Sequence, residues 1–178
     1  MIHLARHGQT AYNAEGRFQG HLPVPLDDTG RAQAAELAEA AARVDVRSLW
    51  CSPLERAKET AAIVAARVGL EPAEDARFAE TDTGDWTGRS FAEIEAEDPD
   101  GFRRFQVSDP AFRYPGGESF AEQSERVQAG LADLRANPAA LPALVVCHRG
   151  VIRLALAART GEPSAGGREI LNAALVTL

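Results

Sequence analysis

The chain has 178 residues, of which 45% are hydrophobic and 25% are charged, a length and composition that fit one folded domain and exclude disordered and fibrous proteins. Its formal net charge of −7 argues against non-specific nucleic-acid binding, which needs a basic surface, so an anionic ligand must be attracted by a local positive cluster. No apolar stretch reaches the ~20 residues that span a bilayer, and Arg6 and His7 end the first apolar run too early for a signal peptide, so we expect a cytoplasmic protein.

The first predicted element is a short buried strand over residues 1–5, which leads directly into Arg6-His7-Gly8. In open α/β sheets, ligands bind at the carboxyl ends of the strands, and a glycine there lets the backbone approach a ligand closely. The strand end would therefore present a cation and a titratable nucleophile. For this pair taken alone, an interior histidine beside an ion pair is the favoured interpretation.

The middle of the chain shows alternating helix and strand signals. A polar cap precedes an amphipathic, alanine-rich segment, and Ser52-Pro53 offers a serine N-cap with a proline at the first helical position. In chain order we expect a loop over 8–26, a helix from the cap at 27–29 to about Val44, a strand over 47–51, a helix from Ser52 to Gly69, and a third strand around 73–79.

Arg56 lies in the first turn of the helix predicted after Ser52. A cation is usually disfavoured there because a helix N-terminus already carries partial positive charge. An arginine at that place is easier to understand if an anion binds between it and the helix end. The alternative is an arginine on a solvated helix surface.

Two capping boxes of the form S-x-x-E, at Ser90 and Ser119, predict the next helices. We expect helices near 90–97 and over 119–136, a short helix plus a loop over the site between 98 and 118, a strand over 141–147, a helix over 151–160 and a last strand over 173–178. Alternating strands and helices predict an α/β fold, a three-layer α/β/α sandwich with a mostly parallel sheet and helices on both faces. We find no internal repeat and no dividing linker.

The most apolar predicted strand ends in Cys147-His148-Arg149-Gly150, which mirrors the histidine and glycine of the first strand end. Two strand ends that present histidine, together with two arginines, would form a compact cationic pocket. The cysteines Cys51 and Cys147 sit in separate apolar runs, so we expect small core residues and no disulfide framework.

Several separate motifs occur in one order along most of the chain. They are Arg6-His7-Gly8, the loop TAYNAEGRFQG with Thr10, Asn13, Gln19 and Gly20, the stretch 25–32, SPLERAKET with Arg56, the segment 80–88, PGGES at 115–119, and His148. Together they resemble the histidine phosphatase superfamily, also called the phosphoglycerate-mutase-like family, and PGGES resembles its phosphatase branch. Arg149 departs from the pattern, since a glycine is common there; it adds charge at the mouth of the pocket or points to solvent.

The resemblance implies a catalytic role for five residues. His7 would attack phosphorus and become a phosphohistidine, which divides hydrolysis into two steps. Arg6, Arg56 and His148 would hold the phosphoryl oxygens, and the planar fork of arginine suits that task. Glu80 would act as general acid and then as general base, a role that a partly desolvated site favours. Without the resemblance, Glu80 reads as an ordinary loop carboxylate.

The resemblance also implies a substrate-binding set and a division of the chain. Thr10, Asn13, Gln19 and Gly20 would bind substrate, Asn13 and the Gly20 N–H as neutral donors. Residues 1–178 would form a single histidine phosphatase domain with a substrate-capping segment at 81–118. Specificity is expected in 98–118, where the candidates are Arg103, Arg104, Phe105, Phe112, Arg113 and Tyr114.

The expected function is hydrolysis of a small phosphorylated metabolite by a metal-independent phosphomonoesterase, with no cofactor, no nucleic-acid or membrane partner, and a homodimer allowed. α-Ribazole phosphate, sugar phosphates and phosphoglycerates all fit. The four histidines lack the ligand spacing of structural zinc sites, so no metal site is predicted.

Three alternatives stay open. A phosphoglycerate mutase is the first, although the chain is short for that branch. A phospho-ligand binding module without catalysis is the second. The third follows from C-x-x-G-x-x-R at Cys147 to Arg153, the loop pattern of cysteine-dependent phosphatases; there Cys147 would supply the nucleophile, but neither flanking residue fits that pattern.

Overall fold

A five-stranded sheet forms the centre of the computed structural model, which describes residues 1–161 and 169–178. Its strand order is β3-β2-β4-β1-β5. The bounds are Ile2–Arg6 for β1, Ser48–Cys51 for β2, Pro72–Glu74 for β3, Ala143–Cys147 for β4 and Leu175–Thr177 for β5. Strands β1 to β4 run parallel, and β5 pairs antiparallel with β1. The mostly parallel sheet predicted from the sequence is therefore confirmed.

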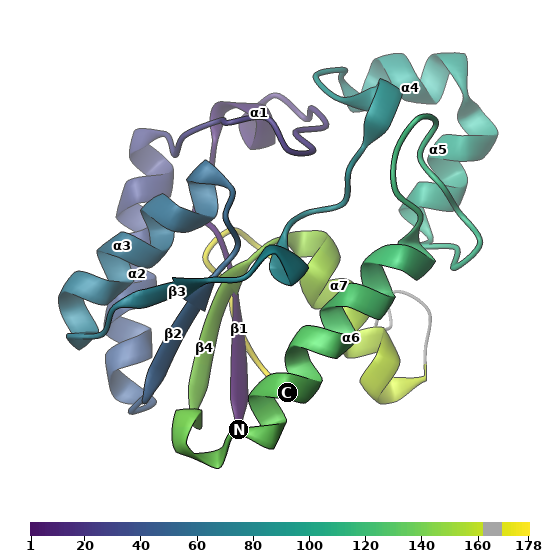
Figure 1. Ribbon diagram of the computed structural model, residues 1–178. Helices are drawn as coiled ribbons and strands as arrows, with labels where there is room; N and C mark the ends of the chain where they lie inside the picture. Colours follow the sequence, from purple (N-terminus) through teal and green to yellow (C-terminus); the bar gives the residue numbers. More distant parts are fainter. Residues whose placement is uncertain (162–168) are drawn as a thin grey trace.

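Helices cover both faces of the sheet (Figure 1). Helices α2 (Asp28–Arg43) and α3 (Glu55–Val68) pack on one face, and α6 (Phe120–Ala136) and α7 (Arg149–Thr160) pack on the other. Successive β4 residues serve opposite faces: Leu144 and Val146 join the core under α2 and α3, while Val145 and Cys147 join the core under α6 and α7. This is the predicted three-layer α/β/α arrangement.

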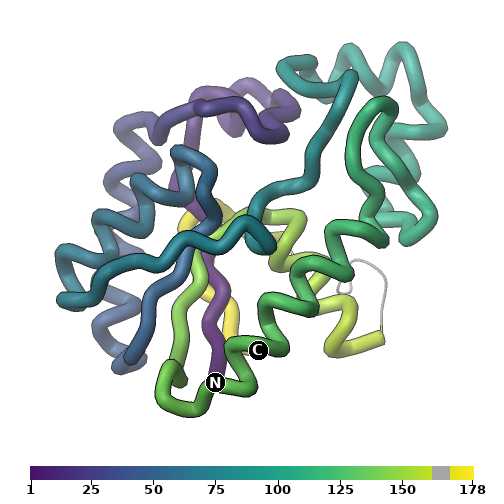
Figure 2. The backbone as a smooth tube through the Cα atoms, viewed as in Figure 1, coloured from purple at the N-terminus to yellow at the C-terminus, as the bar shows by residue number. Residues whose placement is uncertain are grey.

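Beyond the carboxyl ends of the parallel strands lie three shorter helices: α1 (Ala11–Ala14), α4 (Phe91–Glu97) and α5 (Pro99–Gln106). The segment 80–90 and the loop 107–118 run side by side there (Figure 2). The Asp85 N–H donates to the Pro115 carbonyl at 2.8 Å, and the Glu118 N–H donates to the Asp82 carbonyl at 2.9 Å. These segments enclose an aromatic cluster that is separate from the two cores of the sheet.

The capping signals locate most of the helix starts. Both predicted capping boxes form, at Ser90 before α4 and at Ser119 before α6, and Asp27 caps α2. Gly69 ends α3 in the left-handed conformation, as expected. A third box, Thr10 with Asn13, creates the one-turn helix α1 inside the segment expected to be a loop.

Two local predictions are wrong. Ser52 is not the N-cap of α3, because its hydroxyl accepts from the Leu54 N–H and pairs with His148, so a turn precedes the helix and Leu54 takes the N-cap position without a side-chain bond. The strand expected around 73–79 ends at Glu74. Asp75 then accepts the Arg77 N–H and starts a 3₁₀ helix, η1 (Ala76–Phe78). Two further 3₁₀ helices are η2 (Gly84–Trp86) and η3 (Pro138–Ala140).

Of the residues that the structure describes, none belong to a helix long and apolar enough to cross a membrane.

Candidate active site

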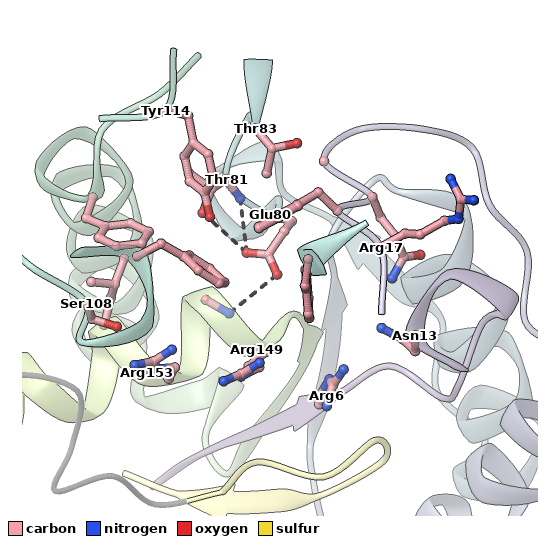
Figure 3. A pocket seen from close by; sticks show the side chains of 18 of the residues that line it. Arg6, Asn13, Arg17, Glu80, Thr81, Thr83, Ser108, Tyr114, Arg149 and Arg153 are labelled. Atoms are coloured by element: carbon pink, nitrogen blue, oxygen red, sulfur yellow. Dashed lines mark hydrogen bonds between the residues drawn. The ribbon is translucent and has the colours of Figure 1, made fainter. Parts of the chain in front are cut away.

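A cavity opens at the carboxyl edge of the sheet, between the strand ends and the segment 81–118 (Figure 3). Most of the residues singled out from the sequence line it: Arg6, His7, Asn13, Gln19, Gly20, Arg56 and Glu80. His148 lies directly behind this lining and is fully buried, with its ring centroid 5.2 Å from that of His7. Thr10 is also fully buried, outside the lining. Segments far apart in the sequence thus meet where the parallel strands end.

His7 is held as a neutral imidazole with one free nitrogen. Its Nδ1 lies 2.7 Å from the Gly8 carbonyl oxygen, which only accepts, so Nδ1 carries the proton and Nε2 keeps its lone pair. Burial, together with the charges of Arg56 and Arg6, holds the pKa of His7 well below its ordinary value. The His7 carbonyl accepts from the Asn172 side-chain amide at 3.1 Å. The ring is thereby fixed in the tautomer that nucleophilic attack requires.

Gly8 is required for a reason other than the one the sequence suggests. A Cβ on Gly8 would lie 2.3 Å from the Gly30 carbonyl oxygen, at the start of α2. The Gly8 N–H donates to the Thr60 hydroxyl at 3.1 Å. The glycine therefore allows close packing of the strand end against a helix, rather than close approach of a ligand.

Arg6 and Arg56 reach the site with their charges unpaired. Arg6 donates to the Ile170 carbonyl at 2.7 Å, and Arg56 donates to the carbonyls of Gly20 at 2.9 Å and Leu22 at 3.2 Å. No carboxylate of the described residues forms an ion pair with either, and the Nε of each is buried without a partner. Burial is the main cause that lowers the pKa of each guanidinium to about 10, so both stay charged at neutral pH.

His148 is oriented by Ser52, the residue that the sequence predicted to be the N-cap of the next helix. Its Nε2 lies 2.7 Å from the Ser52 hydroxyl, and its Nδ1 is buried with no hydrogen-bond partner in the described part of the chain. Burial, then the charge of Arg56, holds the pKa of His148 well below its ordinary value. The structure therefore places a second neutral imidazole against the first.

Glu80 is held across the cavity by neutral donors. Its Oε1 accepts from the Thr81 N–H at 3.0 Å, and its Oε2 accepts from the Gly150 N–H at 3.4 Å (Figure 3). Oε1 also accepts from the Gln123 amide at 3.2 Å. A Cβ on Gly150 would lie 2.4 Å from Oε1. The carboxyl group thus sits directly against the first turn of α7, in a place that only glycine leaves open.

The backbone of Glu80 is fixed as well. Its carbonyl accepts from His21 Nε2 at 2.7 Å and from Arg126 at 3.1 Å. Arg126 also donates to the carbonyls of Arg77 and Ala79 and forms a two-point ion pair with Glu118. Glu118, the glutamate of the PGGES motif, lies outside the cavity lining. It fixes Arg126, and Arg126 in turn fixes the backbone of Glu80.

The loop after β1 supplies neutral polar groups. Asn13 Oδ1 accepts from the Thr10 N–H at 3.1 Å and from the Asn172 amide at 3.2 Å, so its own amide N–H groups are left for the cavity. The Thr10 hydroxyl donates to Gln19 Oε1 at 2.9 Å. Thr10 therefore orients Asn13 and Gln19 from behind. Gly20 lines the cavity with a φ of 49°, where a Cβ would meet the Thr83 hydroxyl at 2.5 Å.

Only part of the segment expected to give specificity reaches the cavity. Phe105 and Tyr114 line it, whereas Phe112 is buried in the aromatic cluster. The three arginines of this segment do not line the cavity, because each forms an ion pair on the surface. The pairs are Arg103 with Asp100, Arg104 with Asp109, and Arg113 with Glu122.

Other residues in or around the cavity escaped the sequence analysis. Arg17, Ser108 and Arg153 line it, and so does Arg149, for which the sequence left two orientations open. Ser52, Gln123 and Asn172 stand behind the lining and bond His148, Glu80 and His7. Arg149 and Arg153 were detectable as cations four apart, right after a strand-end histidine.

Cys147 gives no support to a thiolate mechanism. Its side chain is fully buried in the core between β4 and the helices α6 and α7, and it does not line the cavity. Burial raises the pKa of the thiol well above its ordinary value. The C-x-x-G-x-x-R pattern contributes its arginine to the site and leaves its cysteine in the core.

Within residues 1–161 and 169–178, no group of three or more histidine, cysteine, aspartate or glutamate side chains is arranged to hold a metal ion.

The chain is similar to known proteins over nearly its whole length. The sequence profile of the histidine phosphatase superfamily, branch 1, matches residues 2–178. A protein of Klebsiella pneumoniae named Probable phosphoglycerate mutase GpmB is 35% identical over 171 residues, which cover 96% of this chain and 79% of that protein. A mycobacterial glucosyl-3-phosphoglycerate phosphatase, solved in complex with VO3, is 34% identical, with a TM-score of 0.88 over 98% of this chain and 90% of that one. YhfR of Bacillus stearothermophilus is 28% identical, with a TM-score of 0.86 over 98% and 88% of the two chains.

Proposed function

We propose that this chain, which belongs to branch 1 of the histidine phosphatase superfamily, is a phosphomonoesterase that hydrolyses a small phosphorylated metabolite through a phosphohistidine on His7. The observation that carries the proposal is the state of His7: a neutral imidazole with a free Nε2, beside two arginines that no carboxylate neutralises. A nucleophile for phosphorus and charges for its oxygens thus occur together at one strand end.

In the first step, the His7 Nε2 lone pair attacks phosphorus, and the bond from phosphorus to the ester oxygen breaks. Arg6, Arg56 and His148 hold the three equatorial oxygens, whose charge dominates the transition state of phosphoryl transfer. Glu80 gives its proton to the departing alkoxide, so that the product leaves as a neutral alcohol.

In the second step, water attacks the phosphohistidine. Glu80, now a carboxylate, takes the proton from the water, and the bond from Nε2 to phosphorus breaks to release inorganic phosphate. Asn13 and the Gly20 N–H stabilise the same oxygens as neutral donors. The arginines supply positive charge throughout, so the proposed route needs no metal; full activity in the presence of a chelator is the matching expectation.

The segment 81–118 is proposed to cap the substrate in a single domain of residues 1–178. Its aromatic cluster forms one wall of the cavity and contributes Phe105 and Tyr114 to the lining. An apolar wall excludes water and strengthens the charge interactions of the phosphoryl group. We place the protein in the cytoplasm, with a small phosphate ester as its partner.

The proposal is tested by trapping the intermediate. The protein is mixed with a 32P-labelled phosphate ester, quenched in alkali, where phosphohistidine survives, and compared with His7→Ala. We expect label on the wild-type chain, none on the variant, and a loss of turnover of at least about a thousandfold. His3→Ala, on the same strand, serves as the control that keeps the label. Phosphate release by the His7→Ala variant would overturn the proposal.

A phosphoglycerate mutase is the second candidate, and the similarity to proteins named as such favours it. The two activities separate in a coupled assay with 2- and 3-phosphoglycerate. We expect inorganic phosphate without interconversion of the isomers. Interconversion without phosphate release would assign a mutase instead, and no trapped phosphoenzyme with any ester would indicate a binding module.

A further inference from the structure

Two arginines of α7 face the cavity without belonging to the set proposed to hold the transferred phosphoryl group. Arg149 and Arg153 both line the cavity, and their spacing of four residues puts them on the same side of the helix. In Figure 3 they follow Arg6 along one side of the cavity. The row of cations therefore extends past the phosphoryl site toward the segment 81–118.

These two charges have no acidic partner in the described chain. Arg153 donates to the Gln106 carbonyl at 3.0 Å, and no carboxylate of the described residues forms an ion pair with it or with Arg149. Around the whole cavity, Glu80 is the one acidic residue in the described lining, against five arginines, of which Arg17 pairs with Glu15 and the other four, Arg6, Arg56, Arg149 and Arg153, form no ion pair in the described chain. One phosphoryl group does not balance this excess.

The neighbouring hydroxyl groups add neutral donors. Tyr114 is 3% exposed and lines the cavity, close enough to Arg149 and Arg153 for their charges to act on its hydroxyl. Burial raises the pKa of Tyr114 well above its ordinary value, so the phenol keeps its proton. Ser108 also lines the cavity, and neither hydroxyl has a hydrogen-bond partner in the described chain. The charge of the Glu80 carboxylate also reaches the Tyr114 hydroxyl, but donors and cations outnumber acceptors in this part of the lining.

Arg153 is half-buried beside the exposed Arg149, and two unpaired cations this close repel each other until an anion joins them. Burial, then the charge of Arg149, lowers the pKa of Arg153, and Arg149 also lowers the pKa of Arg6. A bound carboxylate or phosphate would relieve both effects and accept from the free hydroxyls.

We propose that Arg149, Arg153 and Tyr114 form a second anion subsite, which binds a carboxylate or a second phosphate on the alcohol part of the substrate. The inference rests on the proposed function and narrows its substrate class to phosphate monoesters whose leaving group is itself anionic. The neutral polar tail of a simple sugar phosphate would leave the two guanidinium groups unpaired.

The test is a binding measurement on the His7→Ala protein, which does not depend on turnover. Calorimetry gives the Kd for two matched pairs: 3-phosphoglycerate against glycerol 3-phosphate, which differ by a carboxylate, and fructose 1,6-bisphosphate against fructose 6-phosphate, which differ by a phosphate. We expect the more anionic member of at least one pair to bind roughly tenfold to a hundredfold more tightly, the range of a charged hydrogen bond. The pair that shows the preference identifies the anion.

Substitution then assigns the preference to α7. Adding Arg149→Gln or Arg153→Gln should reduce the ratio of the two Kd values at least about fivefold, because each removes one charged donor pair. The control is Arg159→Gln, the same charge change on an exposed residue in the last turn of the same helix, and it should leave the ratio unchanged.

Equal affinities within both pairs would overturn the subsite, and so would a preference that survives both substitutions. The proposed function fails by a different result, the absence of phosphate release and of a labelled His7 in the wild-type protein.

Discussion

At the scale of single residues, the site depends on cations whose donors are left for a ligand. Arg56 is 1% exposed, and carbonyls rather than carboxylates accept from its guanidinium. Carbonyl oxygens orient the fork but do not neutralise its charge. The planar geometry is thereby fixed while the electrostatic attraction remains available to a phosphoryl group.

This arrangement predicts that charge alone does not replace Arg56. We expect Arg56→Lys to lower kcat/KM for a phosphate ester at least about thirtyfold, because an ammonium group cannot bond two carbonyls and an oxyanion in one plane. Steady-state kinetics measure the loss. Arg67→Lys, the same change on an exposed arginine of α3 that pairs with Glu39, is the control and should have wild-type kinetics. Equal kinetics in both variants would contradict the role given to the fork.

For Cys147 we expect an effect on stability and none on activity. Because its thiol is buried in the core and outside the cavity lining, Cys147→Ala should keep wild-type kcat/KM while it lowers the free energy of unfolding by about 1 kcal/mol for the lost packing. Kinetics and denaturant unfolding of the same variant measure the two effects. A fully folded variant without activity would restore the thiolate mechanism.

At the scale of the elements, one ion pair connects α6 to the segment after η1 that bears Glu80. Arg126 bonds three backbone carbonyls of residues 77–80 while Glu118 holds it from the other side. Both side chains are mostly buried, so the pair is shielded from solvent. We propose a positioning role for Arg126: it would set where the Glu80 carboxyl stands relative to the leaving oxygen of the proposed reaction.

Arg126→Gln should therefore impair proton delivery more than phosphoryl binding. We expect kcat to fall about tenfold or more for an alkyl phosphate and much less for p-nitrophenyl phosphate, whose leaving group needs no proton. The control is Arg113→Gln, which breaks the exposed pair with Glu122 near the start of α6. Equal losses with both esters would reduce Arg126 to a purely structural residue.

Local sequence signals determine most of the elements. Short apolar runs located the strands, and the boxes at Ser90 and Ser119 located two helices to within one residue, because capping is decided by neighbours in sequence. The same reasoning gave the wrong role for Ser52, which is not the N-cap of α3. Its hydroxyl bonds His148, which is 96 residues away, and a bond of that range has no local signature.

The candidate site shows the same division. Residues directly after strands, such as His7 and His148, are predictable because parallel strands end at one edge. Gln123 and Asn172 are not, because they reach Glu80 and His7 only through the packing of α6 and of the chain before β5. Long-range contacts therefore complete the site.

At the scale of the whole molecule, the cavity is positively charged although the chain as a whole carries a net negative charge. The chain carries −7, yet five arginines and one glutamate line the cavity in the described chain. An anionic substrate is thus attracted over short range only, and salt screens attraction between separated charges beyond about 10 Å at 0.1 M. The compact cluster of arginines is therefore the feature that suits this acidic protein to bind a phosphate.

The same buried cluster makes folding depend on pH. His7 and His148 are neutral in the folded protein because burial and nearby arginines hold each pKa well below the value of about 6.5 that unfolded histidine has. Below pH 6.5 the unfolded chain therefore binds more protons than the folded one. The free energy of unfolding therefore keeps its full value above that pH and decreases as the pH falls below it, because protonation of these histidines favours the unfolded chain.

We expect the free energy of unfolding to fall between pH 7.5 and pH 5.5 by about 1 kcal/mol for each of these two histidines, since most carboxylates do not titrate in that range. Denaturant unfolding at both pH values measures the change. In His7→Gln the glutamine amide can still donate to the Gly8 carbonyl but cannot titrate, so this variant should lose about 1 kcal/mol less than the wild type. If the two proteins lose the same amount, His7 binds its proton as readily in the folded protein as in the unfolded chain, which would contradict the buried neutral imidazole on which the proposed mechanism rests.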